Sequence, residues 1–166
     1  RFRYGLSRNT PRKSLKAIYG SVQAINKAIT DGNSIFIPEG EKDVDTLTKR
    51  GYTALTYGGS GDWQSEFATL FKDAEVNILA DNDEPGRKVA NAILSDLKEI
   101  AKSAKVIVPV PDIPKADISD YFAAGHSNED FEKLIHSAIT DNESNPAPVM
   151  TVPKGTQLVR KLVELD

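Results

Sequence analysis

The 166-residue chain contains no cysteine and only two histidines, His126 and His136. Without thiols it can form no disulfide, no cysteine-ligated zinc site and no cysteine nucleophile. Two histidines also exclude a histidine-rich metal centre. Any bound metal must therefore be held by oxygen ligands, which favours Mg²⁺ or Mn²⁺. The lack of cysteine fits a reducing compartment, and we expect the protein to work in a cytoplasm.

Long hydrophobic runs are also absent. The apolar runs, such as residues 35–37 and 78–80, are far shorter than the roughly 20 residues that span a bilayer. We therefore expect no membrane segment. Hydrophobic residues make up 39% of the chain and charged residues 27%, which excludes a disordered polyelectrolyte. A chain of this length can bury a substantial core.

The net charge of −3 conceals a basic N-terminal arm. Residues 1–16 contain no acidic side chain and carry Arg1, Arg3, Arg8, Arg12, Lys13 and Lys16. Such a stretch is either a solvated arm or a contact for a phosphate backbone, for which Arg8, Arg12 and Lys13 are the candidates. Because the chain begins with Arg1, we expect it to derive from a longer protein.

Short apolar runs alternate with amphipathic segments, a pattern typical of an α/β fold with a parallel sheet of about four strands flanked by helices. We expect an arm over residues 1–19, one domain over 20–140, and a proline-rich linker that starts the next domain over 141–166. Expected strands are 34–38, 52–57, 76–80 and 106–110; expected helices are 21–28 (ended by Gly32), 41–50, 62–71 (capped by Asp62), 85–101, 118–124, 128–139 and 156–165.

Acidic residues or glycines follow each expected strand, and ligands of open parallel sheets bind at that edge. Asp81 and Asp83 are two residues apart and point the same way in extended backbone. Taken singly, each residue could be a helix cap, a turn or a surface charge. Together, several carboxylates in one cleft repel one another unless a divalent cation is present. The residues are Glu39, then Gly58 and Gly59, then Asp81 and Asp83, then Asp117 and Asp120.

This pattern resembles the TOPRIM domain (a Rossmann-like fold) of bacterial and phage primases and primase–helicases, over about residues 34–125. The matching segments are Glu39-Gly40-Glu41-Lys42-Asp43, Gly58-Gly59, Asp81-Asn82-Asp83-Glu84-Pro85-Gly86-Arg87, and Lys115 to Tyr121.

The resemblance implies magnesium- or manganese-dependent chemistry on phosphodiester bonds. Glu39 would be the general acid or base, and with Asp81 and Asp83 it would form the metal site. Asp43 and Asp117, with Asp120 as a further candidate, would complete a second site. Phosphate or nucleic acid would contact Lys42, Arg87, Lys115 and the Gly58-Gly59 loop.

The implied function is a DNA primase that joins nucleoside triphosphates on a single-stranded DNA template. It would work beside a helicase domain, in the same or a partner chain, in a bacterial or phage-infected cell. A TOPRIM nuclease would use the same metal site. Two other classes stay open: a receiver domain with Asp81 as phosphate acceptor, and a non-catalytic nucleic-acid-binding module that uses the basic arm. A topoisomerase is disfavoured because no candidate segment for the domain with its nucleophilic tyrosine is present. The zinc-binding module that precedes many primase domains would need cysteines, and this chain has none.

Overall fold

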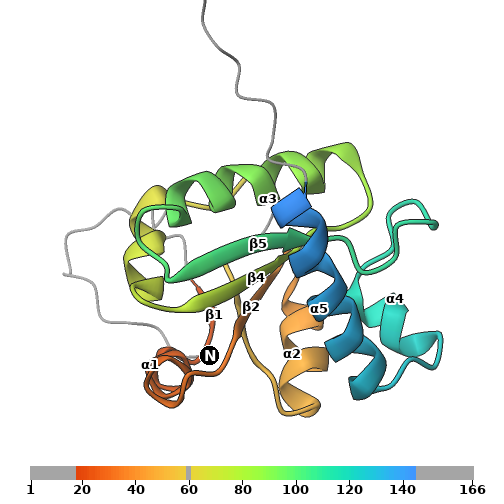
Figure 1. Cartoon of the computed structure of the whole chain (residues 1–166), viewed down its shortest axis with the longest axis horizontal. Coiled ribbons are helices and arrows are strands. Elements are labelled where there is room, and N and C mark those ends of the chain that lie inside the picture. Colours follow the sequence, from red (N-terminus) through yellow and green to blue (C-terminus); the bar gives the residue numbers. More distant parts are fainter. Residues whose placement is uncertain (1–17, 59–60, 145–166) are drawn as a thin grey trace, which may run out of the picture.

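The computed structural model describes residues 18–58 and 61–144, with side chains through Ala138 at the C-terminal end (Figure 1). The elements are β1 (Tyr19–Gly20), α1 (Val22–Asp31), β2 (Ile35–Pro38), α2 (Glu41–Lys49), β3 (Thr53–Thr56), the 3₁₀ helix η2 (Ser65–Phe71), β4 (Glu75–Leu79), α3 (Glu84–Leu97), β5 (Ser103–Ile107), α4 (Ile118–Ala123) and α5 (Asn128–Ser144). The basic arm with Arg8, Arg12 and Lys13, the glycine Gly59, and the expected helix over 156–165 lie outside the described residues.

The protein has a mixed α/β fold of the Rossmann-like class. Its five-stranded sheet has the order β1-β3-β2-β4-β5. The strands β3, β2, β4 and β5 are parallel, which confirms the expected parallel sheet, and β1 joins β3 in the antiparallel direction.

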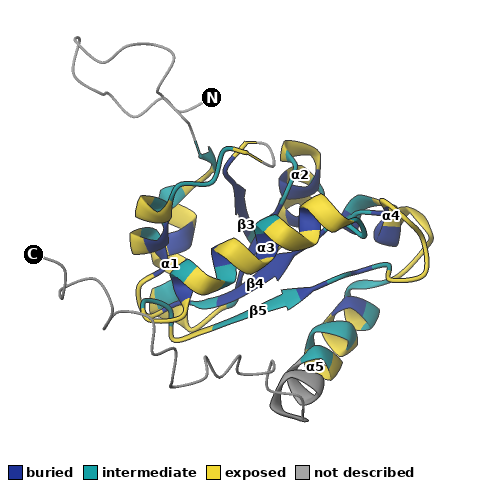
Figure 2. Cartoon of the chain, turned by 90° about the horizontal axis from the view of Figure 1, so that it is seen from above, coloured by how far each residue is buried: buried dark blue, intermediate teal, exposed yellow. Residues whose placement is uncertain are grey.

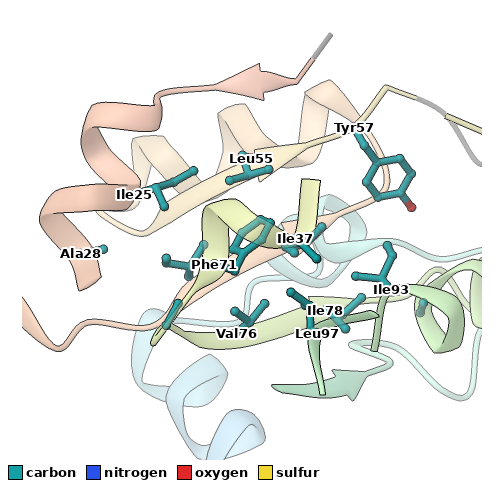
Figure 3. Close-up of a cluster of buried hydrophobic side chains, with 14 of the residues drawn as sticks. Ile25, Ala28, Ile37, Leu55, Tyr57, Phe71, Val76, Ile78, Ile93 and Leu97 are labelled. Atoms are coloured by element: carbon teal, nitrogen blue, oxygen red, sulfur yellow. The ribbon is translucent and has the colours of Figure 1, made fainter. Parts of the chain in front are cut away.

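Helices cover both faces of this sheet, and each face has its own hydrophobic core (Figure 2). On one face α1, η2 and α3 bury side chains such as Ile25, Phe71 and Ile93 against β2, β3 and β4 (Figure 3). On the other face α2, α4 and α5 pack around Phe36 and Phe131. Successive strand residues point to opposite faces, so the short apolar runs supply both cores at once.

The short strand β1 was not predicted. Two residues carry no alternating pattern, and the pairing depends on Gly20, whose φ is +139°. A Cβ atom at Gly20 would lie 2.7 Å from the Cβ of Leu55. Only glycine therefore lets the chain approach β3 this closely.

Several element boundaries also differ from expectation, among them the end of α1, at Asp31 instead of residue 28, and the end of α3, at Leu97 instead of residue 101. The strand β5 lies at 103–107 instead of 106–110, because this edge strand is only partly buried and shows no continuous apolar run. The segment after residue 62 begins as a 3₁₀ helix after Gln64, so the predicted capping role of Asp62 is wrong. The helix α5 continues to Ser144, so residues 141–144 are helical and not linker.

Within the described residues, no helix combines the length and apolarity needed to cross a membrane.

Candidate functional site

Two neighbouring parallel strands deliver the first acidic residues to one edge of the sheet. The last residue of β2, Pro38, is paired with Leu79, the last residue of β4. Glu39 follows Pro38 directly, and Asp81 lies two residues after Leu79. Both acids are half-buried. The hydroxyl of Thr56 at the end of β3 donates a 2.7 Å hydrogen bond to the backbone oxygen of Glu39, which fixes the chain at this point.

The carboxylates at this edge interact electrostatically. Burial raises the pKa of Asp81 to about 7, and the negative charges of Glu39, Asp43, Asp117 and Asp83 contribute to the rise. Burial also raises the pKa of Glu39, with further contributions from Asp83 and Asp43. These five residues are called the carboxylate rim below. Few positive side chains balance the negative charge of the rim. Such an excess of like charge is typical of sites that bind a cation or a proton.

Asp83 holds the start of α3 in place. Its Oδ1 accepts a 2.7 Å hydrogen bond from the backbone nitrogen of Gly86, which makes it the N-cap of the helix. A Cβ at Gly86 would lie 3.1 Å from the backbone oxygen of Asp81 and from Oδ1 of Asp83. Glycine at this position therefore lets the first turn of α3 pack directly against the two aspartates.

Asn82, between the two aspartates, points away from the rim and ties it to the loop after β5. Its amide donates to the backbone oxygens of Pro111 (2.7 Å) and Ile113 (2.9 Å). Its Oδ1 accepts from Nη1 of Arg87 at 2.7 Å. Arg87 was predicted to contact phosphate. In the structure it is bound to Asn82, which adjoins both aspartates in the sequence.

Asp43 is the buried member of the rim and is only 4% exposed. It accepts hydrogen bonds from the hydroxyl of Ser119 and, at 3.3 Å, from the backbone nitrogen of Ser119. Burial raises the pKa of Asp43, and the Ser119 hydroxyl partly opposes the rise. Asp43 was predicted as a metal ligand; the structure shows it joining α2 to α4.

Replacing Ser119 with alanine should destabilise the fold by about 1–3 kcal/mol, because it leaves a buried carboxylate short of a donor. Removing that donor also raises the pKa of Asp43 further above its unfolded value. Ionising Asp43 then costs the folded protein more free energy. The decrease in the free energy of unfolding should therefore be larger at pH 8 than at pH 4. Urea unfolding at both pH values measures this. The exposed Ser95→Ala on α3 is the control, and an equal loss at both pH values would contradict the assigned contact.

Asp117 and Lys42 form an ion pair across the same edge. Nζ of Lys42 lies 2.6 Å from Oδ2 of Asp117, and this hydrogen bond is the main reason that the pKa of Lys42 is raised. Asp117 also caps α4 in a reciprocal capping box with Asp120. Lys42, predicted to bind phosphate, is therefore the nearest internal counter-charge of the rim. Lys115 is exposed, has a left-handed backbone (φ 61°) and donates its N–H to the oxygen of Asn82 at 2.9 Å.

Sequence reasoning missed Tyr57, which follows β3 and is 3% exposed. Burial raises its pKa, and the charges of Glu39 and Asp81 raise it further, so the neutral phenol borders the rim. The adjacent Gly58 has φ +111°, which fits the predicted glycine turn. Tyr57 immediately precedes the Gly58-Gly59 pair, and that position at a strand end was the available signal.

The rim suits a hard divalent cation in its chemistry, since its donors are carboxylate oxygens. In the described part of the chain, no three acidic or histidine side chains stand close enough to form a finished ligand set. Binding an ion between Glu39, Asp81 and Asp83 would therefore require these carboxylates to come closer together.

Fold and site define the class: a Rossmann-like α/β protein with a carboxylate rim at the ends of its parallel strands. The chain is 35% identical, over 77 residues, to a protein of Mycobacterium phage D29 described as "Gene 57 protein". The match covers 46% of this chain and 47% of the phage protein, so it spans about half the length of each. No family model matches the chain, and no solved structure does.

Proposed function

We propose that this chain is the TOPRIM-type catalytic domain of a DNA primase, which joins nucleoside triphosphates on single-stranded DNA with Mg²⁺ or Mn²⁺. The observation that carries the proposal is that Glu39, Asp81 and Asp83 follow the ends of two adjacent parallel strands and raise one another's pKa values or those of their neighbours electrostatically. A divalent cation bound between them would relieve their mutual repulsion.

In this proposal Asp81 and Asp83, with Glu39, would hold the metal, which would supply positive charge for the phosphates and lower the pKa of the attacking hydroxyl. Glu39 accepts the proton of that hydroxyl, a role that its raised pKa favours. Lys115 and Arg87 stand at the edges of the rim for the phosphate chain. Lys42 would join them by leaving Asp117, which would then be free to serve a second ion.

Primer synthesis tests the proposal directly. The purified chain is incubated with labelled nucleoside triphosphates and single-stranded DNA, with Mg²⁺ and separately with EDTA. Labelled oligoribonucleotides should form only with Mg²⁺, and Asp83→Asn should give none. Asparagine is also a good N-cap, so this variant keeps α3 intact. Cut template strands in place of new primers would favour the TOPRIM nuclease.

The chain would act in the replication of a phage or mobile element, and its similarity to a phage protein is compatible with a phage origin. A helicase is the partner that primer synthesis would need, in the same or a neighbouring chain. This element of the proposal is tested by co-purification of the chain with a helicase encoded beside it.

The basic arm should contribute binding to the DNA template. Neutralising Arg8, Arg12 and Lys13 with glutamine should weaken single-strand binding and reduce the slope of log K against log salt by about 2, at roughly 0.7 per charge. Fluorescence anisotropy with labelled oligonucleotides over a salt series measures both. An unchanged slope would remove the arm from the interface. Binding that survives Asp81→Asn and Asp83→Asn in a chain that makes no primers would favour the non-catalytic module.

A further inference from the structure

A pocket of about 450 Å³ is lined by residues of the loop after β5, of the helix α4 and of the segment that follows α4. This volume falls in the range of small-molecule sites. Its walls are mainly apolar and include Val110, Ile113, Pro114, Tyr121 and Ala124. Ile113 is 57% exposed, and among the described residues it is the one large hydrophobic residue that is exposed.

The polar groups of the pocket are few and of mixed kind. Lys115 offers donors, Asp120 offers acceptors, and His126 can act as either. The ring of His126 is stacked on Tyr121 with 4.1 Å between centroids, so one wall consists of aromatic surface. Apolar walls with both donors and acceptors at the edge suit a flat heteroaromatic ring better than a sugar or a phosphate.

The pocket lies near the carboxylate rim, because the two share one stretch of chain. Lys115 and Ala116 line it, and Asp117 of the rim is the next residue. At 3.8 Å per residue, the Cα atoms of Lys115 and Asp117 are at most about 8 Å apart. Two backbone hydrogen bonds join the same loop to the segment between the two aspartates, from Lys115 to the oxygen of Asn82 and from Asn82 to the oxygen of Ala116. A ligand anchored at the rim by its phosphates can therefore reach the pocket.

We propose that this pocket receives the base of a nucleoside triphosphate whose phosphates lie at the carboxylate rim. The inference rests on the proposed function for the position of the phosphates, and it adds a subsite for the base. Lys115 is placed between the two parts of the ligand, at the mouth of the pocket and next to the rim. Ile113 covers the base from the solvent side.

The test compares ATP with inorganic tripolyphosphate, which has the phosphates but no base. Both are titrated into the full chain with Mg²⁺ by calorimetry. ATP should bind about tenfold more tightly, as expected for one stacked base. Ala124→Phe, which fills the pocket, should remove this advantage and leave tripolyphosphate binding unchanged. Ile113→Ala should reduce the advantage severalfold, and because Ile113 is exposed the fold should be unaffected.

Ala123→Phe is the matched control, since Ala123 is exposed, adjacent and not part of the pocket lining. It should bind ATP like the unaltered chain. Equal affinities for ATP and tripolyphosphate, or no effect of Ala124→Phe, would overturn the base pocket while leaving the metal site intact. Absence of ATP binding would also overturn it. A separate titration with Mg²⁺ alone shows whether the metal site has failed too.

Discussion

Asp81→Asn should abolish magnesium binding and primer synthesis, and at the same time stabilise the metal-free protein at neutral and alkaline pH. Asp81 interacts with every other acid of the rim. Removing its charge takes away the centre of the proposed metal site. The same change relieves the repulsion that the folded chain bears when no cation is present.

The direction of the stability change follows from proton linkage. The pKa of Asp81 is raised to about 7 in the folded protein, from an unfolded value near 4. Between these values the folded state holds a proton that the unfolded state has released, so stability falls as the pH rises from about 4 to 7. Asparagine cannot ionise and lacks this loss. With allowance for solvent screening at a half-buried site, Asp81→Asn should gain about 1–2 kcal/mol at pH 8.

Calorimetric titration with Mg²⁺ and urea unfolding in EDTA at pH 4 and pH 8 measure the two effects. Glu84→Gln is the matched control, because it removes one nearby but exposed negative charge at the start of α3. It should retain magnesium binding and show little gain in stability. Equal magnesium affinity for Asp81→Asn and the unaltered chain would contradict the proposed site, whatever the stability result.

Glu39→Gln should retain magnesium binding, weakened at most, and lose about 10²- to 10⁴-fold in the rate of primer synthesis. Glutamine keeps the size of the side chain, and the bond from Thr56 to the backbone of Glu39 keeps its position. What it removes is the ability to accept a proton. Single-turnover synthesis of a first dinucleotide, at saturating Mg²⁺, measures this step.

Glu41→Gln provides the comparison, since Glu41 is an exposed acid in the first turn of α2, two residues further on. Its rate should be close to that of the unaltered chain. A Glu39→Gln protein with full activity would remove Glu39 from proton transfer, and the rim would then act through metal binding alone.

The sequence predicts most of the sheet and its helices because apolar runs and helical spacing are local signals. The helix ended by Gly32 is an example, with Gly32 in the left-handed conformation at the end of α1. Features without such a signal were missed. The pairing of β1 depends on the close approach of Gly20 to Leu55. The position of the partly buried β5 is determined by its pairing with β4, and its own residues carry little strand signal.

The site follows the same division. Glu39, Asp81 and Asp83 could be placed at one edge because the ends of parallel strands meet there. The partners of other candidates could not be foreseen. Ser119 lies 76 residues from Asp43, and no local sequence pattern in either segment predicts their hydrogen bond. Lys42 and Asp117, both predicted to meet ligands, instead meet each other in the protein without ligands.

The antiparallel direction of β1 determines where the N-terminal segment joins the sheet. Tyr19 is paired with Thr56, the last residue of β3, so the chain enters the fold on the side where Glu39 and Asp81 lie. The basic stretch of residues 1–16 precedes this point in the sequence. A polyanion held by that stretch would have a high local concentration at the rim without any contact to the acidic domain surface itself.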